Sequence, residues 1–482
     1  MKVGEDRGEE GRRKGMKSQR NLSRPEPRRV GNVVIIAAML LSLCILSLIK
    51  ARYCSTPYEK SDGNMRFEAE RKESLKIATE AEDHKGEEEE DASDSIEAGR
   101  VTCFQETKRS ETCEAHGDIR VQGSSLTIFV DQMQQEKKIK PYSRKHDPVA
   151  MAHISEWTFK PFAGGQPPPA CTVNHSVPAL VFSVGGFTGN LFHDYTDLLV
   201  PVFITSHKYH GKVQFLMSNY KSWWVNKFMQ IFKQLSKYEM IDIDNDQEVR
   251  CFRRVVVGPT FHKEIGVDPS KTPGGYSVVD FKKVLREAFG LERATATPTG
   301  DQWDIRRKPR LLIISRKSTR MFLNERKMVD MATSLGFDVR IGEADINTEV
   351  SKFARLVNSA DVMIGVHGAG LTNMVFLPAG AVLIQVVPYG GLEWLARSTF
   401  HDPAKDMEIN YMEYKIQLDE TTLSEQYPKD HPVLKDYYSI HKQGWDAIKT
   451  IYLDKQNVRP HLGRLKITLQ EALKLLPHTH PN

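Results

Sequence analysis

A glycine-rich turn within Asp361 to Asn373 (DVMIGVHGAGLTN) carries the residues with the clearest chemical potential. An apolar run ends there, and a predicted helix follows. Glycine lets the backbone approach a ligand closely, and the free amides at a helix start attract anions, so the turn is typical of a phosphate site. A strand-to-helix turn without a ligand is the alternative. The residues expected to contact the phosphate are His367, Gly368, Ala369, Gly370, Leu371, Thr372 and Asn373.

Basic residues follow an earlier apolar run, RLLIISR, which ends at Arg316. Guanidinium groups bind phosphate oxygens in pairs, and a unit charge at about 4 Å contributes on the order of 4 kcal/mol at an effective dielectric near 20. We expect Arg316 and Arg320 to bind the same anion and to neutralise a departing phosphate. For Arg320 and Lys317, a solvated basic cluster is the alternative.

A second strand–turn–helix pattern, GGFTGNLFHDYTDLLVP, begins at Gly185. His193 and Asp197 lie four residues apart, which puts both side chains on one helix face. Either group can take a proton from an attacking hydroxyl. Asp197 is the first candidate for the general base, with His193 orienting the substrate or acting as the base itself, and Asn190 and Asp194 are expected to contact the acceptor. A helix cap with a solvated face is the alternative.

Three aspartates in IDIDNDQE form overlapping Asp-x-Asp patterns: Asp242, Asp244 and Asp246. Such carboxylates can hold magnesium or manganese against a diphosphate. They follow a short apolar run and lie far in sequence from the glycine turn. We therefore interpret them as a strand-end turn and predict no metal site.

Short apolar runs alternate with helical patterns along the body of the chain, which predicts an α/β fold. Nearly continuous apolar strands indicate parallel sheets covered on both faces by helices. The polar segment 294–308 (ATATPTGDQWDIRRK) reads as a linker. The sequence predicts two Rossmann-like domains facing a cleft, 101–305 and 306–482, the second with a closing helix near its end. The predicted strands are 178–184, 212–218, 253–259, 310–316, 337–343, 361–366 and 381–388.

The first hundred residues of this 482-residue chain have a different character. Residues 1–29 are polar and basic, Val30 to Ile49 is an uncharged apolar run long enough to cross a bilayer, and 50–100 is acidic and poor in aromatic residues. This order predicts a cytoplasmic tail, a membrane anchor and an unfolded stem, with the remainder luminal or extracellular. Asn174 in Asn-His-Ser would then be a glycosylation site. The net charge of +5 indicates no nucleic-acid-binding patch.

Four of the six cysteines fall in the predicted luminal body, where disulfides are more common than metal sites. The ten-residue spacing of Cys103 and Cys113 favours a local bridge, although four cysteines allow three connectivities. The other two body cysteines are Cys171 and Cys251.

Several motifs taken together resemble plant members of glycosyltransferase family 61, from about Cys103 to Leu476. The resemblance lies in the cysteine pair with GDIRV, in GGFTGNLFHDYTD, SRKSTRMFLN and VHGAGLTNMVFLPAGAVLIQVVP, and in DMEINYMEY and YPKDHPV. It implies a GT-B architecture and a Golgi type II membrane protein whose expected protein partners are other glycosyltransferases in a Golgi complex. The implied donor is a UDP-sugar bound by the second domain, and the implied transfer is inverting and needs no metal or other cofactor.

The plant branch resembled here places arabinofuranose or xylose on xylan. The resemblance therefore implies UDP-arabinofuranose as the first choice of donor, UDP-xylose as a close second, and xylan as the acceptor. An N-glycan-core xylosyltransferase, a protein O-GlcNAc transferase and a glycan-binding protein without activity are the alternatives. The residue spacing does not identify the sugar, because discriminating one hydroxymethyl group takes only about 1 to 3 kcal/mol.

Overall fold

The computed structural model describes residues 100–131, 133–162, 168–298, 308–343 and 348–477. The predicted cytoplasmic tail, the membrane anchor and nearly all of the stem lie outside these ranges. Within them, no helix combines the length and apolar character that a membrane crossing requires.

The second half of the described chain, 308–477, is built on a sheet in which every pair of neighbouring strands is parallel. The strand order is β12-β11-β13-β14-β15, so the chain reverses direction across the sheet between β11 and β13. In such sheets, ligands bind outside the carboxyl ends of the strands at this reversal. The strands are β11 (Arg310–Ile314), β12 (Asp338–Gly342), β13 (Val362–Val366), β14 (Val382–Val387) and β15 (Asn410–Lys415).

The first half, 100–298, carries a larger sheet with the main order β4-β5-β3-β2-β10-β7-β8-β9. The predicted parallel arrangement holds for β10, β7, β8 and β9, but β2 runs antiparallel to β1, β3 and β10. The strands are β1 (Val101–Thr107), β2 (Ser110–Gln122), β3 (Thr127–Val130), β4 (Lys137–Ile139), β5 (Trp157–Pro161), β6 (Val173–Asn174), β7 (Ala179–Ser183), β8 (Gln214–Ser218), β9 (Ile241–Asp242) and β10 (Val249–Val257).

The mixed character of the first sheet has a physical cause in its strand compositions. The segment of β2, SETCEAHGDIRVQ, alternates buried and partly exposed positions, which is the pattern of an antiparallel strand with one solvated face. The apolar runs of β7 and β8 are buried at every position, as expected for parallel strands covered on both sides.

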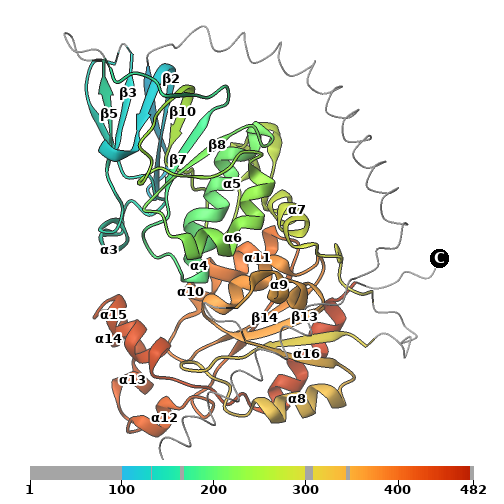
Figure 1. Cartoon of the computed structure of the whole chain (residues 1–482). Helices are drawn as coiled ribbons and strands as arrows, with labels where there is room; N and C mark the ends of the chain where they lie inside the picture. The colour runs from blue at the N-terminus through green and yellow to red at the C-terminus, as the bar shows by residue number, and fades with distance from the viewer. Residues whose placement is uncertain (1–99, 132, 163–167, 299–307, 344–347, 478–482) are drawn as a thin grey trace, which may run out of the picture. The chain divides into compact units, whose positions relative to one another are not determined.

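Helices pack against the second sheet and against the β7–β8 part of the first sheet (Figure 1). In the first half they are α3 (Pro148–Met151), α4 (Leu191–His193), the π-helical turn η2 (Asp194–Leu199), α5 (Val200–Ser206), α6 (Ser222–Leu235) and α7 (Val278–Phe289). In the second half they are α8 (Glu325–Ser334), α9 (Val350–Asn358), the 3₁₀ helix η6 (Ala369–Phe376), α10 (Glu393–Ala396), the π-helical turn η7 (Arg397–His401), α11 (Asp402–Asp406), α12 (Leu423–Gln426), α13 (Pro432–Lys435), α14 (Tyr437–His441), α15 (Trp445–Ile448), the π-helical turn η8 (Lys449–Asp454) and α16 (Leu462–Leu475).

The two halves share apolar contacts. The ring of Phe376 in η6 lies 6.2 Å from Tyr195 and 5.7 Å from Phe289, both edge to face. Part of the predicted linker is tied to the second half, because the Ala296 amide donates to the carbonyl of Ala379. Helix α16 packs against α8, β14 and β15, so it closes the second half.

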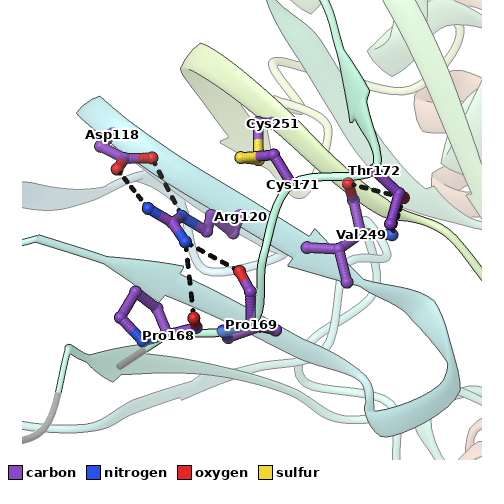
Figure 2. The surroundings of a disulfide bond; sticks show 8 residues. All are labelled: Asp118, Arg120, Pro168, Pro169, Cys171, Thr172, Val249 and Cys251. Carbon is purple, nitrogen blue, oxygen red and sulfur yellow. Dashed lines mark hydrogen bonds and ion pairs between the residues drawn. A yellow bond between two sulfur atoms is a disulfide. The ribbon is translucent and has the colours of Figure 1, made fainter. Parts of the chain in front are cut away.

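Two disulfides join neighbouring segments to β2 and β10, which are adjacent strands in the middle of the first sheet. The predicted local bridge joins Cys103 to Cys113 across the β1–β2 pair. A second bridge joins Cys171 to Cys251 of β10, and Figure 2 shows Thr172 hydrogen-bonded to Val249 beside it. Arg120 donates to the carbonyl of Pro169 in the same segment.

The segment that Cys171 holds leads directly into β6. Asn174 lies there with its side chain exposed, so it is accessible to glycosylation, which stays a prediction.

Candidate functional site

The turn after β7 shapes the first part of the site. Gly186 and Gly189 have φ of 60° and 104°, which favours glycine, and a Cβ at Gly186 would lie 2.4 Å from the Tyr142 ring. Asn190 caps the following helix by accepting from the amide of Phe192. The turn is therefore fixed both by its own backbone and by the ring packed against it.

His193 is the last residue of α4, and Asp197 lies in the π-helical turn η2 that follows it. Pro201 has no N–H to donate to the Asp197 carbonyl four residues earlier, and the helix widens just before it. His193 Nδ1 lies 2.9 Å from Asp197 Oδ2. The Asp197 side chain is fully buried and the His193 side chain is 16% exposed. The structure thus brings the two predicted residues together, and of the two only the imidazole reaches solvent.

Three further side chains bind the Asp197 carboxylate, and no motif or spacing in the sequence predicted them. Arg109 Nη2 lies 2.7 Å from Oδ1, Arg144 Nη1 lies 3.2 Å from Oδ1, and the Tyr142 hydroxyl donates to Oδ2 at 3.2 Å. Burial, together with the charge of Asp197, raises the pKa of Tyr142, so its hydroxyl stays protonated and can donate. The Asp197 carboxylate therefore already accepts hydrogen bonds from several donors of the protein.

The two arginines are held in place by other groups. Arg109 is ion-paired with Glu264 and lies 4.2 Å from the centre of the Phe261 ring. Arg144 Nε lies 3.0 Å from Asp147 Oδ2. Arg109 lies in the turn between β1 and β2, 88 residues before Asp197, so only the fold brings them together.

The surroundings of Asp194 give it a structural role. It is fully buried, and its Oδ1 accepts from the Gly189 amide and from the Trp224 indole, both at 2.8 Å. Burial raises its pKa to about 6. Asp194 therefore holds the glycine turn from beneath, whereas Asn190, the other predicted acceptor contact, is exposed.

The second part of the site lies where β11 and β13 end. Gly368 follows β13 with φ of 147°, and a Cβ there would lie 2.9 Å from Arg320 Nη1 and 3.0 Å from Arg316 Nη1. Both guanidinium groups therefore lie against this glycine. Arg320 donates to the His367 carbonyl, and Arg316 donates to the Thr319 carbonyl at 2.7 Å.

The two guanidinium groups form a concentrated positive charge. Burial, together with the charge of Arg316, lowers the pKa of Arg320 to about 10, and burial lowers the pKa of Arg316. Within the ranges that the structure covers, neither arginine forms an ion pair with a carboxylate. An anion bound at Gly368 would neutralise this pair.

The residues after Gly368 form a 3₁₀ helix, which supplies the predicted helix start. Ala369, Gly370 and Asn373 line a cavity, and Asn373 donates to the carbonyl of Gly370. Leu371 and Thr372 are fully buried, so their side chains pack beneath the turn and not toward a ligand.

His367 is held as a neutral imidazole. Burial, together with the charges of Arg320 and Arg316, lowers its pKa to about 3. The Tyr411 hydroxyl donates to Gln385 Oε1 at 2.8 Å, and Gln385 Nε2 lies 2.7 Å from His367 Nδ1. With Gln385 donating to Nδ1, the ring hydrogen is on Nε2.

A cavity of about 510 Å³ lies between the two glycine turns. Its size and its lining by both halves suit a small molecule with an anionic group. The lining includes Gly189, Asn190, Leu191 and Lys227 from the first half, and Arg316, Glu343, Val350, Phe353, Gly370 and Asn373 from the second.

Aromatic rings connect the two glycine turns. Phe400 of η7 lies 5.6 Å from the His367 ring and 5.9 Å from the Phe192 ring, and Phe192 in turn lies 5.5 Å from the His193 ring. These packed rings therefore link the His193–Asp197 pair to the arginine pair, although neither His193 nor Asp197 is among the residues that line the cavity.

The three aspartates of the Asp-x-Asp pattern have local partners. Asp244 accepts from Ser218 and from the Tyr220 amide, Asp246 pairs with Arg250, and Asp242 accepts from Asn245. These bonds agree with their interpretation as a strand-end turn. Among the residues the structure covers, the one group of three potential metal ligands within 4.8 Å is Cys103, Glu111 and Cys113, whose cysteines are disulfide-bonded.

Comparison with known proteins identifies the family. The model named Glycosyltransferase 61 matches residues 188–384. An alpha-1,3-arabinosyltransferase of Oryza sativa subsp. japonica is 44% identical, over 82% of this chain and 68% of the relative. A beta-1,2-xylosyltransferase of the same plant is 41% identical over 78% and 84%, and a xylan glycosyltransferase of Arabidopsis thaliana is 39% identical over 77% and 79%. The resemblance found in the motifs is confirmed, and the chain belongs to glycosyltransferase family 61.

Proposed function

We propose that this protein transfers a pentose from a UDP-sugar to xylan, with arabinofuranose as the first choice and xylose as the second. The observation that carries the proposal is the 44% identity to an alpha-1,3-arabinosyltransferase over most of the chain. The relatives at 41% and 39% identity, a beta-1,2-xylosyltransferase and a xylan glycosyltransferase, support the pentose class and the acceptor.

The two sheets and the cavity between their glycine turns support a GT-B architecture. In this proposal the diphosphate binds at Gly368 and Gly370 against Arg316 and Arg320, because this pair lacks carboxylate partners within the described chain. The amides of Ala369 and Gly370 and the Nε2–H of His367 are further donors to it. Charge on the departing UDP would be stabilised by these groups without a metal ion.

We assign the general base to His193 rather than to Asp197, the first candidate from the sequence. The buried carboxylate already accepts from Arg109, Arg144 and Tyr142, so it is poorly placed to take a proton from a sugar hydroxyl. A carboxylate at Nδ1 orients the imidazole and leaves Nε2 for the acceptor.

The proposed reaction is a single displacement. The acceptor hydroxyl gives its proton to His193 Nε2 while its oxygen bonds to the anomeric carbon, and the bond from that carbon to the diphosphate breaks with its electron pair leaving on UDP. One displacement inverts the anomeric configuration and needs no enzyme nucleophile. Asn190, expected from the sequence to contact the acceptor, lines the cavity, so in this proposal it lies beside the donor.

The proposed setting is the Golgi membrane, with residues 30–49 as the anchor and the catalytic part in the lumen. Apolar character and flanking charge in the sequence support this topology. Complexes with other Golgi glycosyltransferases fit such a setting.

A panel of donors tests the function. The full chain, purified in detergent, is incubated with xylan oligosaccharides and with UDP-arabinofuranose, UDP-xylose or UDP-N-acetylglucosamine, and products are identified by mass and by the anomeric NMR signal. We expect pentose transfer with an anomeric configuration opposite to that of the donor. A folded protein that turns over none of these donors would be a glycan-binding protein and would overturn the proposal.

A further inference from the structure

The strand order of the second sheet fixes the direction in which a bound donor extends. The cavity is lined by Glu343 after β12, by Arg316 after β11 and by Gly370 after β13. With the diphosphate at the β13 end, a nucleoside that fills this cavity lies toward β12. The sugar then faces β14, the next strand in the order, about 4.8 Å further along the sheet.

Three exposed aromatic side chains lie on α10, α14 and α15, helices that pack in one hydrophobic cluster with Val387 at the end of β14. Trp394 on α10 is 52% exposed, Tyr438 on α14 is 64% exposed and Trp445 on α15 is 49% exposed. We refer to these three side chains as the aromatic surface. Because these large aromatic groups are carried by helices of one packed cluster, they are a candidate binding surface.

The aromatic surface has a rigid base. Tyr437 packs on the turn after β14 so closely that a Cβ at Gly391 would lie 2.3 Å from its ring. The His441 ring donates to the carbonyl of Gly390 at 2.8 Å, and the Tyr437 and Tyr438 rings lie 4.6 Å apart. These contacts join α14 to the turn that starts α10, so Trp394 and Tyr438 are carried by one packed unit.

The same helix that carries Trp394 reaches the proposed reaction site. Helix α10 continues without interruption through η7, and Phe400 lies six residues after Trp394, about 9 Å along a helix. Phe400 contacts His367 and also Phe192, the neighbour of His193. Figure 1 shows α10 next to α4, the helix of His193.

We propose that the aromatic surface binds the xylan acceptor, at backbone residues beyond the one that receives the pentose; this inference rests on the proposed function. Pyranose rings present flat C–H faces to aromatic rings, while their hydroxyls reach the phenol and indole donors. The three exposed side chains are aromatic and not aliphatic, which suits an uncharged polysaccharide. Binding energy from such remote units positions the reacting hydroxyl at His193.

The dependence of activity on acceptor length tests this surface. Kinetics of the full chain in detergent are measured with xylobiose and with xylohexaose for Trp394→Ala, Trp394→Phe and the double variant Tyr438→Ala/Trp445→Ala. We expect both alanine variants to raise KM for xylohexaose about tenfold, with KM for UDP-sugar and for xylobiose unchanged, and Trp394→Phe to restore part of the loss. Tyr238→Ala, which removes a 40% exposed aromatic ring from the first half, is the matched control.

A binding measurement separates this inference from the proposed function. Affinity electrophoresis in gels containing xylan needs no donor, so retardation of the wild type that the alanine variants lose supports the surface even if no donor is turned over. Equal retardation, or an unchanged dependence on acceptor length in an active enzyme, overturns it. Loss of an oligomeric species in the variants with acceptor kinetics intact also overturns it, because the surface would then bind protein.

Discussion

His193 Nδ1 lies 2.9 Å from the buried Oδ2 of Asp197, while two arginines and a tyrosine hydroxyl bind the same carboxylate. This arrangement makes the two residues differ in their ability to accept a proton from the acceptor. The carboxylate has its acceptor positions filled from within the protein, and the imidazole keeps one nitrogen for the solvent side. The proton from the acceptor is therefore expected to reach the ring and not the carboxylate.

Removing the imidazole should strongly reduce turnover without affecting the donor site. His193→Ala is expected to lower kcat about 10²- to 10⁴-fold, the range of general base catalysis, with the Kd for UDP unchanged. Asp197→Asn should lower kcat as well, because it disturbs the ring orientation, and should also lower the melting temperature, since Arg109 and Arg144 lose a buried partner. A His193→Ala enzyme with nearly full kcat would assign the base elsewhere.

Substitution of Gly368 should specifically weaken donor binding. Gly368→Ala would place a Cβ about 3 Å from both guanidinium groups at a φ that disfavours side chains, so the arginines must move. We expect the Kd for UDP, measured by calorimetry, to rise about tenfold or more. Gly336→Ala is the matched control, because Gly336 also has a positive φ, 95°, but an added Cβ would meet nothing within 4 Å.

The Gly336→Ala control separates the effect of backbone strain from the effect of displacing the two arginine side chains. Gly336→Ala should cost about 1 kcal/mol of stability and leave the Kd for UDP unchanged. Equal weakening of UDP binding in both variants would count against Gly368 as the diphosphate site.

The arginine pair should contribute directly to donor affinity. Replacing Arg316 or Arg320 by alanine removes charge-assisted hydrogen bonds worth about 1.5 to 3 kcal/mol, so the Kd for UDP should rise about 10- to 100-fold. Arg340→Ala, which breaks an exposed ion pair with Asp338 in the same half, serves as the control. UDP binding that is insensitive to both substitutions would exclude this pair from the donor site.

How much the sequence could predict depended on whether the signal was local. The buried strands β7, β11, β13 and β14 were predicted because parallel strands covered on both faces are continuous apolar runs. The edge strand β15 was missed, since most of its positions are partly exposed and its composition is polar.

The same distinction holds within the site. His193 and Asp197 were paired correctly because helical spacing is a local signal. Arg109, Tyr142 and Arg144 reach Asp197 across 88, 55 and 53 residues, and no spacing rule in a single sequence connects such positions. The burial of Asp197 could not be predicted from the sequence either, although this burial decides which of His193 and Asp197 is better placed to act as the base.

The proposal that transfer needs no metal ion can be tested directly with a chelator. Transfer by the full chain should be the same with and without an excess of EDTA, because the diphosphate charge is assigned to Arg316 and Arg320. Asp244→Asn should lower the melting temperature, since Asp244 accepts from Ser218 and the Tyr220 amide, and should leave the KM for UDP-sugar unchanged. Activity that EDTA abolishes and manganese restores would assign that charge to a metal.

The buried carboxyl group of Asp194 predicts a pH dependence of stability. Its pKa is raised from 3.8 to about 6 by burial, so its stabilising contribution is complete below about pH 4 and is lost as the pH rises through about 6. Asp194→Asn keeps an oxygen for the Gly189 amide and the Trp224 indole but cannot ionise. The melting temperature of the wild type should therefore fall relative to that of Asp194→Asn between about pH 4 and about pH 7, by the equivalent of at most about 3 kcal/mol. The exposed Asp419→Asn should show no such trend, and a difference between wild type and Asp194→Asn that stays constant with pH would mean that Asp194 does not titrate in this range.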